Sequence, residues 1–281
     1  MMNPDLNKII LQALAEDRAL HDITTQTLIA KNQMSRAYII LKEEAVLCGL
    51  EVARKIFQKL DPHIQIRSSY KDGDKANKNR KILLLKGKTW AILAGERVAL
   101  NFLGHLSGIT TSTRRFVKAA GSAKVKIMDT RKTTPGLRAL ERLAVKAGGG
   151  TNHREHLGDM VLIKDNHLFA LRKKMTIPEI IRSFRQKTKK TLELEVDHLV
   201  QLKIALSAAP DIILLDNMTT AQLRQAVKMN KQSKKPCLLE ASGGVNLQNI
   251  RAIAGTGVDR ISIGALTHCV KSIDFSLELL D

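Results

Sequence analysis

Six short strand-like runs recur after about residue 120, and they constrain the fold more than any other feature of the chain. They lie at Val125–Asp129, Met160–Lys164, Leu192–Val196, Ile212–Asp216, Cys237–Ala241 and Arg260–Gly264. Helical patterns separate them, at Leu137–Lys146, Leu199–Ala208, Ala221–Met229 and Leu247–Ala254. Alternation of this kind predicts a parallel sheet with crossover helices. Because a complete barrel needs eight such units, six predict an incomplete α/β barrel.

The first part of the chain lacks this rhythm. Helical patterns and antiparallel-looking strands follow one another there without alternation, at 6–16, 36–41, 50–60 and 82–85. A long helical pattern covers Trp90 to Lys118, with a break expected at Ser107–Gly108. We therefore expect one domain over 1–118, a barrel over 119–269, and a C-terminal helix at about 270–281 that packs back on the first domain.

Charged or glycine-rich residues follow each of the six strand-like runs. They include Asp129, Lys164, Glu193, Glu195, Asp197, Asp216, Glu240, Ser242 and Gly264. A single polar residue after a strand is usually a turn or a helix cap. In parallel α/β barrels, however, the carboxyl ends of the strands build the active site. Six such ends together therefore predict an active site.

Several cations belong to these strand ends. They are Arg131, Lys132, Lys164 and, after the three glycines at 148–150, His153 and Arg154. Arginine suits the two-pronged recognition of carboxylates and phosphates. Their number predicts a ligand that carries several negative charges. A barrel aldolase with Lys164 as its Schiff-base lysine is an alternative, although it leaves the arginines unexplained.

Carboxylates at the same strand ends predict a magnesium site. Glu193 and Asp216 follow neighbouring strands, and Mg²⁺ takes oxygen ligands that it shares with substrate phosphates. Because side chains alternate along a strand, Glu193 and Glu195 share a face. Glu195 is therefore a second candidate, or the partner of a lysine.

Glycines in the last two units predict a phosphate cradle. Ser242, Gly243, Gly244 and Gly264 are expected to open helices after the late strands. Backbone N–H groups at a helix start bind phosphate, and glycine allows a close approach. The chain contains no Walker loop and no GxGxxG after a first strand, so nucleoside triphosphate and dinucleotide sites lack support.

The net charge of +19 permits three interpretations. They are a nucleic-acid-binding module, a lysine-rich surface with no partner, and a positive field that attracts small anions. Aromatic residues make up only 3% of the chain, which leaves few side chains to stack on bases, so we expect no nucleic-acid partner. Three dispersed cysteines, together with the lack of a signal-like start or a long apolar stretch, predict a cytoplasmic protein without membrane attachment.

Ordered motifs over nearly the whole chain carry a family resemblance. The longest is DTRKTTPGLRALERLAVKAGGGTNHREHLGDMVLIKDNH at 129–167. Others are GERVALNFLGHLSGITTSTRRF (95–116), ELEV (193–196), LLDNM (214–218), EASGGVN (240–246) and SIGALTH (262–268). In this order they closely resemble the quinolinate phosphoribosyltransferases, which are also called carboxylating nicotinate-nucleotide pyrophosphorylases.

The resemblance implies an α/β fold of the type II phosphoribosyltransferase kind, with an N-terminal α/β sandwich-like domain and an incomplete parallel α/β barrel. It implies decarboxylating phosphoribosyl transfer to quinolinate in NAD biosynthesis. Quinolinate would contact Arg97, Thr130, Arg131, His153, Arg154 and Lys164. Phosphoribosyl pyrophosphate would contact Lys132, Glu193, Asp216, Ser242, Gly243, Gly244 and Gly264. Lys132, Lys164, Glu193 and Asp216 would be catalytic, with Mg²⁺ as cofactor at Glu193 and Asp216. A transferase that prefers nicotinate is the runner-up.

Arg97 is the implied quinolinate ligand that lies outside the barrel. Its helical run, GERVALNFL, is rich in Ala, Leu and Phe and is expected to be buried, and a buried arginine requires an anion. The resemblance implies that this anion is the substrate of a neighbouring subunit. We therefore expect a homodimer, or a higher oligomer, whose active site includes Arg97 of the partner chain.

Overall fold

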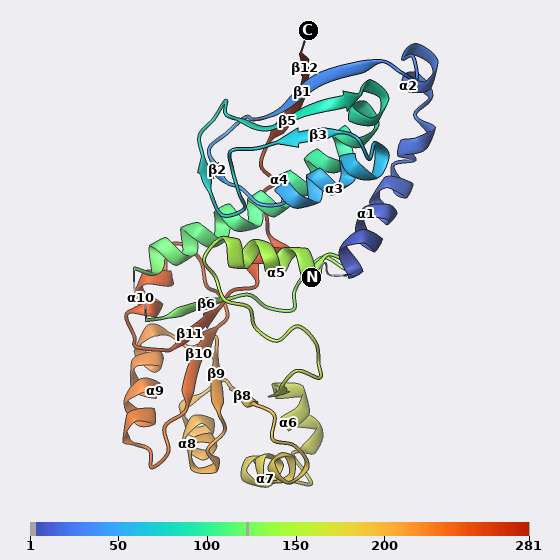
Figure 1. Cartoon of the computed structure of the whole chain (residues 1–281). Helices are drawn as coiled ribbons and strands as arrows, with labels where there is room; N and C mark the ends of the chain where they lie inside the picture. Colours follow the sequence, from blue (N-terminus) through green and yellow to red (C-terminus); the bar gives the residue numbers. More distant parts are fainter. Residues whose placement is uncertain (1–3, 122–123, 281) are drawn as a thin grey trace. The chain divides into compact units, whose positions relative to one another are not determined.

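The structure is a computed structural model that describes residues 4–121 and 124–280. It divides the chain into two compact units (Figure 1). The antiparallel unit comprises residues 1–114, 133–149 and 266–281, and the parallel unit comprises residues 115–132 and 150–265. Among the described residues, no helix is both long enough and apolar enough to cross a membrane.

The antiparallel unit is built on a four-stranded sheet in the order β12-β1-β5-β3. Its strands are β1 (Met34–Leu41), β3 (Gln65–Arg67), β5 (Lys81–Lys88) and β12 (Phe275–Leu280), and β2 (Ala45–Val46) pairs separately with β4 (Lys75–Ala76). Its helical segments are α1 (Pro4–Glu16), η1 (Ala19–His21), α2 (Ile23–Leu28), α3 (Leu50–Leu60) and α5 (Arg138–Ala147). Helix α4 (Thr89–Ala120) begins in this unit, and α11 (Ala265–His268) ends in it.

Helix α3 shows how the sequence forms this unit. Leu50, Ala53, Ile56, Phe57 and Leu60 recur three and four residues apart, and all five are buried. This spacing places them on one face of the helix. A Cβ on Gly95 would lie 2.9 Å from the Phe57 ring, so the glycine lets α4 approach α3 closely.

The parallel unit confirms the incomplete barrel expected from the six runs. Its strands are β6 (Lys126–Met128), β7 (Val161–Ile163), β8 (Leu192–Val196), β9 (Ile212–Asp216), β10 (Leu238–Ser242) and β11 (Arg260–Ser262). Its further helices are α6 (Asp165–Leu171), α7 (Ile177–Lys187), α8 (Leu199–Ala208), α9 (Thr220–Gln232) and α10 (Ile250–Ala254). The strands pair in the order β6-β11-β10-β9-β8-β7, in parallel throughout. Strands β6 and β7 are neighbours in sequence but lie at opposite edges, so these two strands do not pair.

The expected break at Ser107–Gly108 is wrong, because α4 is continuous through it. Gly108 serves a close contact within the antiparallel unit. A Cβ there would lie 2.4 Å from the Lys271 carbonyl oxygen and 2.7 Å from Val270 Cγ1. One turn earlier, Gly104 accepts a backbone hydrogen bond from Ile273 at 3.0 Å. The two glycines therefore let the segment 270–273 cross the helix at backbone distance.

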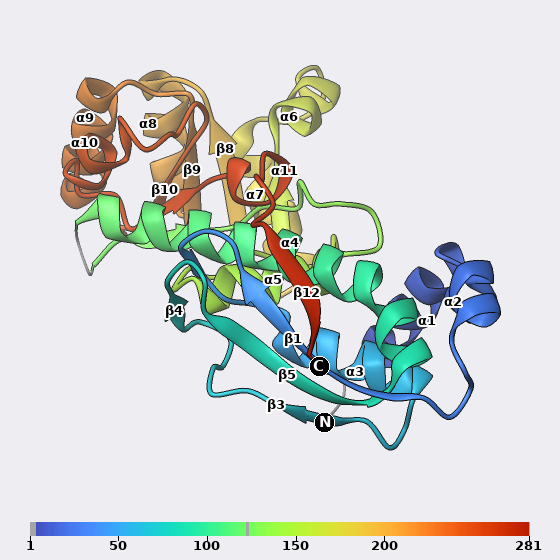
Figure 2. The same cartoon turned by 90° about the horizontal axis from the view of Figure 1, so that it is seen from above.

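The expected C-terminal helix is also wrong. Residues 275–280 form β12, which pairs antiparallel with β1 from Arg36–Leu280 to Leu41–Phe275, and residue 281 lies outside the described residues (Figure 2). The segment does pack on the antiparallel unit, as expected. It does so as a strand, because the ladder satisfies the backbone donors and acceptors along the outer edge of β1.

The chain division also differs from the expected boundary at 118/119. Residues 133–149 belong to the antiparallel unit, although they were expected in the barrel. The Arg114 side chain on α4 holds the end of this segment, donating to the carbonyls of Gly148 at 3.0 Å and Ala147 at 3.1 Å.

Substituting Gly108→Ala should destabilise the protein despite the better helix propensity of alanine. The added methyl group would overlap a backbone carbonyl, and overpacking of this kind costs roughly 1–3 kcal/mol, against about 1 kcal/mol gained from propensity. Chemical denaturation should show a lower transition midpoint. Gly158→Ala is the control, because a Cβ there meets nothing within 4 Å. Equal midpoints for both variants would contradict the close contact at Gly108.

Candidate active site

One face of the parallel sheet carries the polar side chains. Glu240 on β10 lies between Arg260 and Leu214, and Leu214 also lies beside Glu195. One pleat further toward the carboxyl ends, Ser242 lies beside Asp216. Because residues two apart share a face, all of these residues face one side. The intervening positions are buried and mostly apolar: Leu194, Val196, Ile213, Leu215, Leu239, Ala241 and Ile261.

The carboxyl ends of β9 and β10 form a glycine loop, Ser242–Gly244, beside Asn217. The Asn217 amide donates to the Ser242 carbonyl at 2.8 Å, and a Cβ on Gly243 would lie 2.1 Å from Asn217 Oδ1. Gly243 also has a φ of +90°, so only glycine fits there. The expectation that this loop opens a helix is wrong, since α10 begins only at Ile250; Gly264 does directly precede α11.

Glu195, Asp216 and Lys164 form a second group at the strand ends. Lys164 Nζ lies 4.0 Å from a Glu195 carboxylate oxygen, and both residues belong to the parallel unit. Burial raises the pKa of Glu195, the Lys164 charge lowers it, and the nearby Asp216 carboxylate raises it again. Of the two glutamates of β8, Glu195 is thus the one whose pKa is affected by the Asp216 charge.

Glu193 lies deeper in the sheet than expected. It pairs with Ile212, and Asp216 follows four residues further along β9, about 13 Å at the usual rise per residue. Glu193 has no exposed surface, and its carboxylate lies 3.1 Å from His153 Nε2. The same nitrogen lies 3.4 Å from Glu240, which is also fully buried. The structure therefore groups Glu193 with His153 and Glu240, and not with Asp216.

Both ring nitrogens of His153 have partners in the protein. Nε2 faces the two glutamates, and Nδ1 accepts the backbone N–H of Arg154 at 2.8 Å. Burial lowers the pKa of His153, but the contacts with Glu193 and Glu240 outweigh it and raise the pKa to about 10. Because Nδ1 accepts a hydrogen bond, it carries no proton, and in this conformation the ring is protonated on Nε2 alone. The neighbouring carboxylates of Glu193 and Glu240 nevertheless favour a second proton on the ring.

Arg131 and Arg154 lie close enough to repel one another. Burial lowers the pKa of Arg154, and the charge of Arg131 lowers it further. Thr130 precedes Arg131 in sequence, and its hydroxyl accepts the backbone N–H of Lys132 at 3.1 Å; the Lys132 side chain is exposed. Two neighbouring guanidiniums can bind an anion with more than one negative charge.

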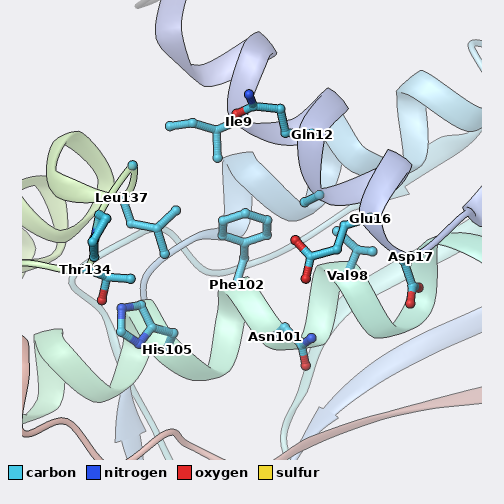
Figure 3. A pocket seen from close by; sticks show the side chains of 13 residues that line it. Ile9, Gln12, Glu16, Asp17, Val98, Asn101, Phe102, His105, Thr134 and Leu137 are labelled. Atoms are coloured by element: carbon cyan, nitrogen blue, oxygen red, sulfur yellow. The ribbon is translucent and has the colours of Figure 1, made fainter.

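Arg97 lies in the antiparallel unit and is exposed, so the expectation that it is buried in its own chain is wrong. The neighbouring residues Val98 and Ala99 are buried, whereas Arg97 lies on the solvent-exposed face of the helix. The same unit contains a cavity of about 470 Å³ between α1, α4 and residues 134–137 (Figure 3). None of the residues predicted for the site lines this cavity.

Comparison with known proteins gives matches over almost the whole chain. Residues 22–107 match the model of the quinolinate phosphoribosyl transferase N-terminal domain, and residues 109–278 match that of the C-terminal domain. The chain belongs to the quinolinate phosphoribosyltransferase family.

Named relatives are similar over their full length. A probable carboxylating nicotinate-nucleotide pyrophosphorylase of Bacillus subtilis is 40% identical, over 99% of this chain and 95% of that protein. A nicotinate-nucleotide pyrophosphorylase structure from Francisella tularensis is 39% identical with a TM-score of 0.92, and covers 100% of this chain and 98% of that chain. These matches confirm the family resemblance and the fold class.

Two residues of the site received no role from sequence reasoning, although both follow predicted strands. Glu240 contacts His153, and the buried Asp129 accepts the His153 backbone N–H at 2.6 Å. Glu240 lies two residues before Ser242 on the same strand, so alternation places both side chains on one face of the sheet. Because a charged residue on a buried strand needs a charged partner, this position could have been recognised as part of the site.

Proposed function

We propose that this chain transfers the phosphoribosyl group of phosphoribosyl pyrophosphate to quinolinate. The products are nicotinate mononucleotide, CO₂ and pyrophosphate, in the biosynthesis of NAD. The observation that carries the proposal is that neighbouring guanidiniums and a glycine loop lie at the carboxyl ends of one parallel sheet. The names of the relatives support the same reaction.

The acceptor half of the site consists of Arg131, Arg154, Lys164 and Thr130. Two adjacent carboxylates on a pyridine ring need cations from more than one direction, and guanidiniums provide paired donors in a fixed plane. A monocarboxylate such as nicotinate would leave part of this charge unpaired. The cation count therefore favours quinolinate over the runner-up acceptor.

The donor half consists of Ser242, Gly243, Gly244 and Gly264, with Lys132. The positive φ angles of Gly243 and Gly244 hold a tight loop, and no atom lies within 4 Å of a Cβ position on Gly244. A phosphate could therefore approach this backbone closely. Late strands of α/β barrels often carry phosphate sites of this kind.

Mg²⁺ fits Glu195 and Asp216 better than the pair expected from sequence. Both offer carboxylate oxygens near the strand ends, where a pyrophosphate would lie beside the glycine loop. Among the described residues, His153, Glu193 and Glu240 form a group with metal-ligand spacing, but it includes a nitrogen and is buried, which does not suit Mg²⁺. When bound, the ion would neutralise charge on the departing pyrophosphate.

The residues of this chain act in the reaction by position and charge. The pyridine nitrogen of quinolinate attacks the anomeric carbon as pyrophosphate leaves, so no side chain is needed as a nucleophile. As CO₂ departs, the electron pair of the carbon–carboxylate bond stays on the ring carbon, where the adjacent positive, alkylated nitrogen stabilises it, and a proton from water then takes the place of the lost carboxylate. Arg131 and Arg154 orient the acceptor, and the strand-end cations stabilise the charge of both substrates.

A homodimer with Arg97 in the partner's site is part of the proposal, and a higher oligomer is compatible with it. An exposed arginine on α4 is available to a neighbouring chain. We also place the enzyme in the cytoplasm, since an exposed thiol at Cys269 suits a reducing compartment.

The first prediction concerns the acceptor. Purified enzyme with phosphoribosyl pyrophosphate and Mg²⁺ should release CO₂ and nicotinate mononucleotide from quinolinate, with a kcat/KM at least a hundredfold above that for nicotinate. A dicarboxylate pairs with a cation that a monocarboxylate would not reach, and such a loss is worth several kcal/mol. A higher kcat/KM for nicotinate would replace the proposal with the runner-up.

The second prediction concerns the carboxylates assigned to Mg²⁺, Glu195 and Asp216. Glu195→Gln and Asp216→Asn should each raise the KM for phosphoribosyl pyrophosphate and the Mg²⁺ concentration at half-maximal rate by tenfold or more. Quinolinate affinity, measured by calorimetry, should stay within about twofold, since two-carboxylate Mg²⁺ sites act on phosphates. Asp197→Asn is the control, because that carboxylate follows the same strand and is 67% exposed. A control that behaves like Glu195→Gln would refute the assignment.

The third prediction tests the shared site. Arg97→Ala and Lys164→Ala chains should each be inactive alone. After subunit exchange at equal amounts, half of the dimers would be mixed with one intact site each, giving about a quarter of full activity. Native mass spectrometry would verify the exchange. Exchanged mixtures that remain inactive would place Arg97 outside the partner's site.

A further inference from the structure

Glu193 and Glu240 form a buried acid pair that the reaction does not use directly. Strands β8 and β10 flank β9, and both side chains project from the same face of the sheet toward His153. Both residues are fully buried, and His153 itself keeps only 8% of its side chain exposed. Beyond this contact, the oxygens of the two carboxylates have no hydrogen-bond partner among the described residues.

His153 in turn ties a loop to the sheet. Its backbone N–H donates to Asp129 at the end of β6, its Nε2 contacts the acid pair, and its Nδ1 accepts the N–H of Arg154. With both ring nitrogens engaged, the imidazole offers no nitrogen to a ligand in this conformation. The residue that His153 fixes is Arg154, one of the two guanidiniums of the anion site.

We propose that Glu240, together with Glu193, is a positioning residue of the acceptor pocket, which acts through His153 to hold Arg154 beside Arg131. This inference rests on the proposed function, because it assigns the acid pair to the quinolinate half of the site. It changes the role implied by the family resemblance, in which His153 contacts quinolinate directly.

Electrostatics supports the same assignment. Two guanidiniums repel one another, and the repulsion from Arg131 lowers the pKa of Arg154, whereas the Glu193 carboxylate raises it. The acid pair therefore offsets part of the cost of holding two arginines together before the ligand arrives. Burial raises the pKa of Glu193, whereas the contact with His153 and the charge of Arg260, which lies beside Glu240 in the sheet, lower it.

The experiment measures quinolinate and phosphoribosyl pyrophosphate affinities separately, by calorimetry on the full chain. Glu240→Ala removes the contact with Nε2 and should raise the quinolinate Kd at least tenfold, with the phosphoribosyl pyrophosphate Kd within twofold. Glu240→Gln keeps an acceptor oxygen and should restore the quinolinate Kd to within about threefold. It also serves if Glu240→Ala fails to fold. Asp259→Asn is the matched control: Asp259 accepts the N–H of Leu239 near the amino end of β10 and takes no part in the contacts of His153, so its loss should lower stability and spare both affinities.

A double-mutant cycle tests the route through Arg154. If Glu240 acts through that guanidinium, Glu240→Ala added to Arg154→Ala should change the quinolinate Kd by less than twofold, since residues that act as one unit are not additive. Full additivity would overturn the inference. So would an unchanged quinolinate Kd in Glu240→Ala, or an equal loss of both ligands.

Two further outcomes are distinct. If a chelator lowered the quinolinate affinity of enzyme without added Mg²⁺, then His153, Glu193 and Glu240 would be ligands of a bound metal ion, and the inference would be overturned. A wild-type enzyme that does not bind quinolinate would overturn the proposed function and this inference with it. Wild-type binding together with normal binding by Glu240→Ala would overturn the inference alone.

Discussion

The interior of the parallel unit contains two fully buried carboxylates, Glu193 and Glu240, and these require positively charged partners. A buried ionised carboxylate is costly unless cations and donors compensate for the lost water. Here the compensation comes from His153 and Arg260, with Arg154 nearby. Elements far apart in sequence are thereby linked by charge, from β8 and β10 to the loop that follows Gly150.

The two halves of the site follow from strand geometry. Polar residues at every second position of neighbouring strands lie at successive depths, so a difference of two residues moves a side chain about 7 Å along the sheet. Asp216 lies beside Ser242 of the glycine loop, where charged phosphates would meet it, and Glu195 lies one pleat below, beside Leu214. Glu193 stays below, where a carboxylate can only serve other protein groups. One strand thus supplies carboxylates to two different tasks.

Sequence reasoning predicted most of the parallel unit. All six strands were located to within one or two residues, because a strand buried on both faces appears as a short apolar run between helical patterns. The sequence could not decide between Glu193 and Glu195 as the partner of Asp216. Alternation predicts which face of the sheet a side chain is on, but its level along the strand depends on the register with β9.

The remaining errors have a common cause, which is contact with distant residues. The continuity of α4 through Gly108 depends on the segment at 270–271, and the extended form of residues 275–280 depends on β1. The partners of His153 likewise come from three different strands. None of these contacts is local: strand parity could assign Glu240 to the polar face, but it could not reveal His153 as the partner of Glu240.

Strand β12 has a consequence for the order in which the nascent chain can fold. The partner of β1 is synthesised more than 230 residues after it, so that at ribosomal rates the outer edge of β1 waits for tens of seconds. The parallel unit, whose last strand ends at Ser262, can assemble first. During that interval the backbone N–H and C=O groups along the unpaired edge of β1 are open to other strands, and chaperone contact would be most useful there. The antiparallel sheet therefore cannot be completed until Phe275–Leu280 has been synthesised.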